Sequence, residues 1–193
     1  MDTLAITDPR FATKLVGQVG GSAIGALATE DAETSILLPG RQGSPAQSFD
    51  FSTCDELLRY RYDAGASAFG VYASDRDGAG HHSGLYAADA YWQVDPSDAL
   101  TVLVGSSSTD YPQEVASAFG QGQDVRNNTS LYPHGAPPRT GTLATQWLLG
   151  YQINPWTVFY AGSSEGYQET PGRQLVPQQR TFFLKGSYYF QPF

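Results

Sequence analysis

The last residues of the chain alternate between two kinds of side chain. From Arg180 to Gln191, one set of alternate residues is mostly polar, and the other is apolar with an aromatic ring near each end: Phe182, Leu184, Gly186, Tyr188 and Phe190. Successive side chains of a β-strand point to opposite faces, so this segment predicts a strand with one apolar and one polar face. Strands of outer-membrane β-barrels have this pattern because their side chains meet lipid and lumen in turn. We expect the strand to end near Gln191, because Pro192 cannot donate to a ladder.

The composition agrees with an all-β chain. The 193 residues include 21 Gly, 12 Tyr and 10 Phe but one Met, and no stretch keeps an apolar 3.6-residue period. The sequence contains no run of 18 apolar residues, so it does not predict a membrane-spanning helix. The formal net charge of −8 disfavours a nucleic-acid partner, which requires clustered Lys and Arg. Cys54 is the one cysteine, so no intrachain disulfide is expected.

The first eight residues contain neither a basic segment nor an apolar run, so they do not predict a signal peptide. An outer-membrane protein must be exported. We therefore expect residues 1–193 to be a single barrel domain or a barrel fragment, from a truncated reading frame or a mature piece.

The alternation predicts nine strands joined by connections of alternating length. The tight turns are expected at Gly20-Gly21, 63–65, 95–98 and 154–156, and the long links at 30–54, 75–83, 108–141 and 164–179. Short periplasmic turns and long extracellular loops are typical of an antiparallel, up-and-down transmembrane β-barrel, here of about 8–10 strands. The predicted strands are Phe11–Val19, Ser22–Thr29, Asp55–Asp63, Ala66–Ser74, Gly84–Val94, Ala99–Ser107, Thr142–Gln152, Thr157–Ser163 and Arg180–Gln191.

The candidate site residues come from the polar set of alternate positions in these strands. A Lys or Arg that faces lipid at the bilayer midplane costs about 2–4 kcal/mol, so we expect such residues to face the lumen. The lumen-facing candidates are Lys14, Arg59, Arg61, Asp63, Asp89, Gln146 and Lys185. They either tune the selectivity of a pore or fill a narrow interior as paired charges. The alternative is a soluble β-sandwich whose polar residues face water.

An odd number of strands raises the question of closure. A complete bacterial barrel has an even number of strands, so nine predict a partner strand missing upstream or a residual strand within Thr3–Asp8. We expect an incomplete or irregularly closed barrel, weakest between the first and last strands. A tenth strand from residues 3–8 or 112–125, or edge-to-edge dimerisation, would relieve the open edges.

The sequence contains no catalytic constellation, so we expect no enzyme activity, cofactor or metal. His81, His82 and His134 are interpreted as solvated loop residues, since a metal site requires further ligands at fixed geometry. The segment 75–78 begins like a calcium loop but lacks the Glu at the twelfth position.

Several segments in a shared order resemble one family. The chain is similar to the outer-membrane β-barrel domain of unknown function that follows a family-nine-like carbohydrate-binding module. The matching segments are Ile6–Gly20, Thr34–Gly40, Leu58–Tyr62, Gly84–Gln93, Leu100–Pro112, Tyr151–Tyr160 and Arg180–Tyr188. The resemblance implies a C-terminal barrel part that lacks the sugar-binding module and has an internal deletion near Gln121–Val125.

The sequence thus predicts a structural or transport-type barrel in the bacterial outer membrane, with lipid as its surroundings. Its other partner would be a missing upstream barrel or sugar-binding module. Two alternatives stay open. One is a surface component of carbohydrate binding or breakdown, implied by the resemblance alone. The other is a soluble all-β binding module.

Overall fold

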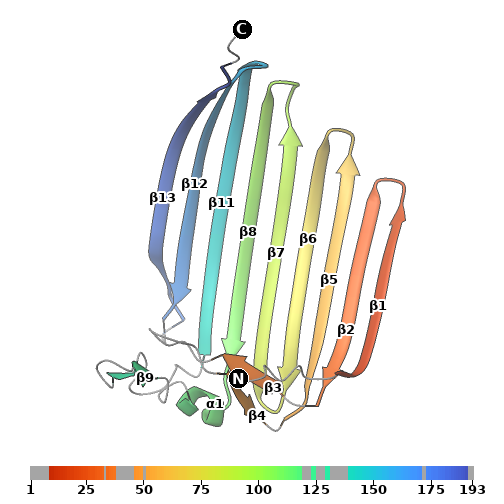
Figure 1. Cartoon of the computed structure of the whole chain (residues 1–193), viewed down its shortest axis with the longest axis vertical. Helices are drawn as coiled ribbons and strands as arrows, with labels where there is room; N and C mark the ends of the chain where they lie inside the picture. The colour runs from red at the N-terminus through yellow and green to blue at the C-terminus, as the bar shows by residue number, and fades with distance from the viewer. Residues whose placement is uncertain are drawn as a thin grey trace.

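Nine antiparallel strands form one open sheet in the computed structural model (Figure 1), which describes residues 9–32, 34–37, 46–49, 51–118, 123–124, 129–130, 139–170 and 173–190. Neighbours in sequence are neighbours in the sheet, an up-and-down arrangement. In the described part of the chain, no helix is long and apolar enough to cross a membrane. The strands, in sheet order, are β1 (Pro9–Val19), β2 (Ser22–Asp31), β5 (Thr53–Ala64), β6 (Ser67–Gly78), β7 (His81–Gln93), β8 (Asp98–Asp110), β11 (Arg139–Asn154), β12 (Thr157–Glu169) and β13 (Leu175–Tyr188).

All nine predicted strands are present, and most are longer than predicted. Residues 164–179, predicted as a long link, belong mostly to the ends of β12 and β13. Residues 75–83 are a second segment that was predicted as a long link. They form the ends of β6 and β7 around a tight turn, in which Ala79 and Gly80 have positive φ angles of 48° and 80°. Asp77 pairs with His82 across this hairpin, so side chains that suggest a loop belong to strands here. In contrast, β13 ends at Tyr188, three residues before the predicted end at Gln191, and residues 189–190 are not in a strand.

The two ends of the sheet differ in their connections. The tight turns after β1, β5, β7 and β11 lie together at the top of Figure 1, which we call the turn end. The opposite loop end carries the two long connections, together with the β6–β7 and β12–β13 turns. The long connections contain short elements that the sequence did not predict: β3 (Thr34–Leu37), β4 (Ala46–Phe49), α1 (Gln113–Ala118), β9 (Gln123–Asp124) and β10 (Thr129–Ser130).

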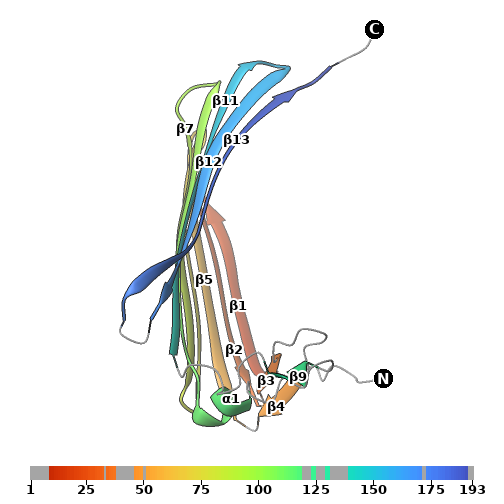
Figure 2. The same cartoon turned by 90° about the vertical axis from the view of Figure 1, so that its left-hand side faces the viewer.

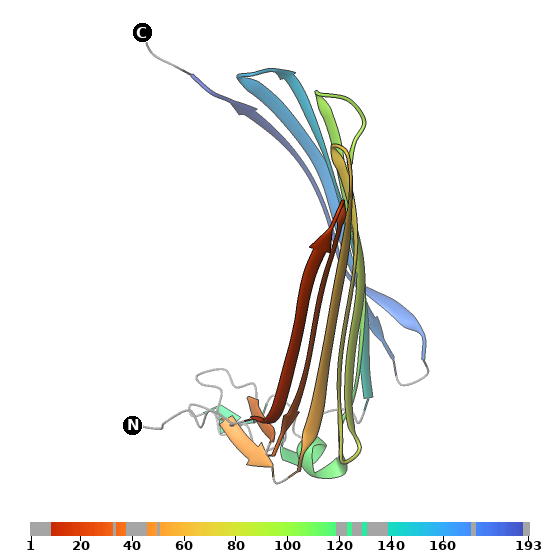
Figure 3. The same ribbon diagram turned by 90° about the vertical axis from the view of Figure 1, so that its right-hand side faces the viewer.

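The sheet is a single twisted layer (Figures 2 and 3). Four apolar residues of the described chain are buried, and Phe49, Val115 and Ala116 among them belong to the loop-end elements. A β-sandwich instead buries the inner faces of two packed sheets. The alternative of a soluble sandwich is therefore not the observed architecture.

The sheet does not close within the described chain. β1 and β13 are its two edges, and no register joins them. The predicted all-β, antiparallel, up-and-down arrangement is therefore confirmed, whereas a barrel stays a prediction. The described residues between 112 and 125 provide no tenth strand: 113–118 form α1, and β9 pairs with β10 rather than with the sheet. The other proposed source, residues 3–8, lies outside the described residues, as does His134.

The strands are staggered from one edge to the other. The paired positions, followed from strand to strand, place Val19 at the end of β1 at the same level as Phe182 in β13. β13 continues to Tyr188, six residues beyond that level. With a rise of about 3.4 Å per residue and strands about 4.8 Å apart, the line of turn ends is inclined by roughly 30°. A stagger of this kind is what tilted barrel strands have.

Candidate functional site

The registers divide the sheet into two chemically different faces. One, which we call the aromatic face, carries apolar side chains in neighbouring positions on every strand. Among its members are Leu15, Ile24, Leu58, Tyr60, Val71, Trp92, Val102, Trp147, Leu149, Phe182 and Leu184. Many of them are exposed, with Phe182 at 68% and Leu184 at 74%.

The opposite surface, the polar face, contains the site residues predicted from the sequence. Asp89 pairs with Gly70, and Gly70 pairs with Arg61, so both charged residues share a face, and the remaining registers connect the others. All seven candidates lie on it: Lys14, Arg59, Arg61, Asp63, Asp89, Gln146 and Lys185. That this face borders a lumen stays a prediction.

An ion pair on the polar face crosses a whole strand. The Arg59 guanidinium on β5 donates to the Asp89 carboxylate on β7, and β6 lies between them. Gly70 of β6 makes this crossing feasible, because a Cβ there would lie 2.9 Å from Asp89 Oδ1. The sequence shows the two charges and the glycine, but the registers are needed to bring them together.

The remaining charges of the candidate set are unevenly paired. Arg61 Nε donates to Asp63 Oδ1 at 2.8 Å, and both side chains are exposed to a similar degree. Lys14 and Lys185, near the two edges, form no ion pair with any described residue. The candidates therefore combine two compensated pairs with two uncompensated ammonium groups, and Gln146 adds a neutral amide.

A small packed cluster lies at the loop end and was missed by the sequence analysis. His81 is 5% exposed, and its ring stacks on that of Tyr111 with the centroids 5.7 Å apart. Phe51 lies on another side, with its centroid 6.4 Å from that of His81. Phe49 and the fully buried Val115 bring β4 and α1 to the same end of the sheet (Figure 1).

The interpretation of His81 as a solvated loop residue is therefore wrong. His81 is the first residue of β7, and aromatic residues from both long connections cover it. Its neighbour His82 is 42% exposed, and its Nδ1 lies 3.6 Å from Asp75 Oδ1. The signal that could have indicated the burial is the recurrence of aromatic residues in segments otherwise typical of loops.

Burial sets the protonation state of His81. Desolvation lowers the pKa of the ring, and a hydrogen bond to the Asp110 carbonyl oxygen, with Nδ1 3.2 Å away, opposes this in part. The positive Arg76 and the neighbouring His82 lower the pKa further, whereas Asp55 raises it. The neutral ring, with its Nδ1–H donated to Asp110, is the form that this site favours.

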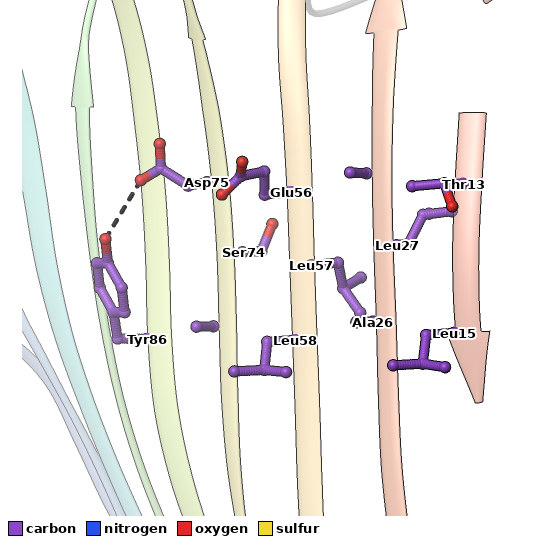
Figure 4. A pocket seen from close by; sticks show the side chains of 12 residues that line it. Thr13, Leu15, Ala26, Leu27, Glu56, Leu57, Leu58, Ser74, Asp75 and Tyr86 are labelled. Atoms are coloured by element: carbon purple, nitrogen blue, oxygen red, sulfur yellow. Dashed lines mark hydrogen bonds between the residues drawn. The ribbon is translucent and has the colours of Figure 1, made fainter. Parts of the chain in front are cut away.

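On the aromatic face, the apolar surface ends at a row of carboxylates. Figure 4 shows a hollow over β1, β2, β5, β6 and β7, with Leu15 and Leu58 on its apolar side. Glu56 and Asp75 lie two residues closer to the loop end, and the Tyr86 hydroxyl donates to Asp75 Oδ2 at 3.2 Å. On β5 and β6 the apolar surface thus lies in the turn-end part of the strand.

Among the described residues, no group of three or more His, Cys, Asp or Glu side chains could hold a metal ion. No family model, curated protein or solved structure matches the chain.

Proposed function

We propose that this chain forms nine strands of the wall of a bacterial outer-membrane β-barrel, with a structural or transport-type role and no catalytic activity of its own. The aromatic face meets lipid, and the polar face borders the interior. The observation that carries this proposal is the consistent separation of the two faces across all nine strands.

Lipid explains the stability of a sheet that lacks a core. Moving a side chain such as Leu or Phe from water to an apolar environment is worth about 1.5–3 kcal/mol. Leu184, Phe182 and Val19 are 74%, 68% and 84% exposed, so each would gain from an apolar solvent. The strands are 10 to 16 residues long, and a transmembrane β-strand needs about 9–11.

Aromatic residues at the turn end fit one membrane interface. Trp156 and Tyr189 stack there with their centroids 5.7 Å apart, and Trp92 and Tyr151 lie near the ends of β7 and β11. Girdles of aromatic side chains mark both interfaces of outer-membrane barrels. In this orientation the turn end is periplasmic, and the loop end with its buried His81 cluster is extracellular.

The charges of the polar face favour an interior that is partly filled. Within the Arg59–Asp89 pair and within the Arg61–Asp63 pair, the opposite charges neutralise each other, as expected for side chains that fill a barrel interior. Lys14 and Lys185 remain available to attract anions if the interior conducts. A transport role would therefore favour anions over cations.

Fluorescence quenching tests the orientation. In a Trp92→Phe, Trp156→Phe variant, Trp147 is the one remaining tryptophan, and we expect lipids brominated on their acyl chains to quench it strongly. The matched control carries Trp147→Phe and Gln146→Trp in the same background. Its indole faces the interior, so the brominated lipids should quench it less and aqueous acrylamide more. Equal quenching at both positions would contradict the proposed orientation.

A further inference from the structure

The two open edges of the sheet run in the same direction. β1 runs from the loop end to the turn end, and each following strand reverses direction. Because the sheet contains nine strands, β13 also runs from the loop end to the turn end (Figure 1). Direct pairing of β1 with β13 would therefore be parallel.

This polarity restricts what can complete the sheet. Within lipid each backbone amide and carbonyl must be paired, so the edges cannot stay open. A second copy turned about the barrel axis would again bring β1 beside β13 in parallel. An inverted copy could pair antiparallel, but its loop end would lie on the wrong side of the membrane. An all-antiparallel wall thus requires an odd number of added strands.

The turn-end parts of the two edge strands have few of the features that prevent strand pairing. Soluble proteins protect edge strands with charges, prolines and bulges. β1 has no charge or proline between Leu15 and Val19, and β13 has only Lys185 after Arg180. Pro177 and the bulge of the β12–β13 pairing lie near the loop end. In their turn-end parts, both edges therefore present unpaired backbone beside an apolar face, whereas the loop-end parts carry Pro9, Arg10 and Lys14 on β1 and Pro177 and Arg180 on β13.

The described sheet has no spare strand for this purpose, because all nine of its strands already lie in one continuous paired order. A strand that covers β1 or β13 along its full length must therefore come from outside the described sheet.

We infer that β1 and β13 are docking edges for an odd number of further antiparallel strands, supplied by polypeptide outside the described sheet. This inference rests on the proposed function, because lipid makes the open edges untenable. The partner strands alternate apolar and polar residues, with the apolar set continuing the aromatic face. They also bridge the stagger between the end of β1 and the end of β13.

Fusions that add one or two strands test whether an odd number is required. Residues 154–169 contain a tight turn and β12, so a copy fused after Phe190 adds one strand that descends from the turn end. The matched control is a copy of residues 154–188, which adds two strands from the same sequence. In detergent, we expect the one-strand fusion to gain a compact, protease-resistant monomer that migrates faster on cold SDS electrophoresis than after boiling. The unfused chain and the two-strand fusion should lack it.

A disulfide assay identifies the competing arrangements. In a Cys54→Ser background, the unfused chain carries Gly17→Cys on β1 and Leu184→Cys on β13. We expect oxidation to give no specific disulfide. A compact monomer with an internal disulfide would indicate parallel closure, and a defined disulfide-linked dimer would indicate completion by a second copy. Either result, or equal compaction of both fusions, would overturn the inference.

The quenching experiment keeps the two proposals separable. If the one-strand fusion alone becomes compact but brominated lipids fail to quench Trp147, the membrane function fails and the edge inference stands. If Trp147 is quenched and strand parity makes no difference, the edge inference fails and the membrane function stands.

Discussion

A charge at Trp147 would test the two faces most directly. Trp147 lies on the aromatic face in β11, opposite Val102 of β8 and Ser163 of β12. Val102 is the central member of the apolar row Leu100–Val104, so Trp147 lies near the middle of the apolar surface. Its ring also contacts that of Phe182, with the centroids 6.4 Å apart.

The expected cost of Trp147→Arg follows from this position. An Arg that faces lipid at the bilayer midplane costs about 2–4 kcal/mol, and this level corresponds to the centre of the apolar row. If the urea m-value is about 3 kcal/mol/M, a loss of about 3 kcal/mol lowers the unfolding midpoint by about 1 M. Urea titration in lipid vesicles, followed by resistance to proteolysis, measures the shift.

The adjacent residue provides the control. Gln146 lies on the polar face between Leu103 and Ser164, so Gln146→Arg keeps its charge out of lipid and should change the midpoint little. Trp147→Phe separates the loss of the indole from the effect of the charge and should cost much less than Trp147→Arg. Equal midpoints for the two Arg variants would refute the assignment of faces in β11.

Three further predictions address orientation, pH and register. On intact cells of a Cys54→Ser background, a membrane-impermeant maleimide should label Ser130→Cys and spare Asn154→Cys; the reverse pattern would invert the orientation. Because burial lowers the pKa of His81 below its ordinary value, the unfolded state binds more protons, so stability should be constant above about pH 6.5 and fall at lower pH. In His81→Gln this decline in the unfolding midpoint should be reduced, and an unchanged pH profile would exclude His81 as its cause. Gly162→Val should displace the Phe183 ring, which lies 2.7 Å from a Cβ built at Gly162, and lower the free energy of unfolding by about 1–3 kcal/mol; an unchanged unfolding midpoint would show that this contact is dispensable.

The strands and their faces could be predicted because both are local properties. A period of two separates Trp147 and Leu149 from Gln146 whatever the rest of the chain does. Paired residues of neighbouring strands lie on the same face of the sheet. Once the faces of one strand are known, the faces of its neighbours therefore follow from the pairing. For this reason the seven polar candidates, chosen strand by strand, lie together on one surface.

The loop end could not be predicted in the same way. The β6–β7 hairpin contains Asp75, Arg76 and Asp77, whose charges suggest a loop, but the backbone registers continue through them. Burial of His81 depends on residues from two separate connections, so no window of sequence contains the cluster. Tertiary contacts override the local pattern at both places.

Cross-strand contacts explain how the sheet keeps one register without a core. Aromatic rings lie over glycines of neighbouring strands: a Cβ at Gly186 would lie 3.2 Å from the Phe159 ring, and one at Gly150 would lie 3.5 Å from the Tyr160 ring. Such contacts distinguish the observed register from one shifted by a residue, which would place the rings on the opposite face. They act only between paired strands, so they cannot substitute for a missing neighbour at β1 or β13. The sheet is therefore specified internally but has two open edges, and if it forms part of a barrel wall as we propose, a further strand rather than a second layer must complete it.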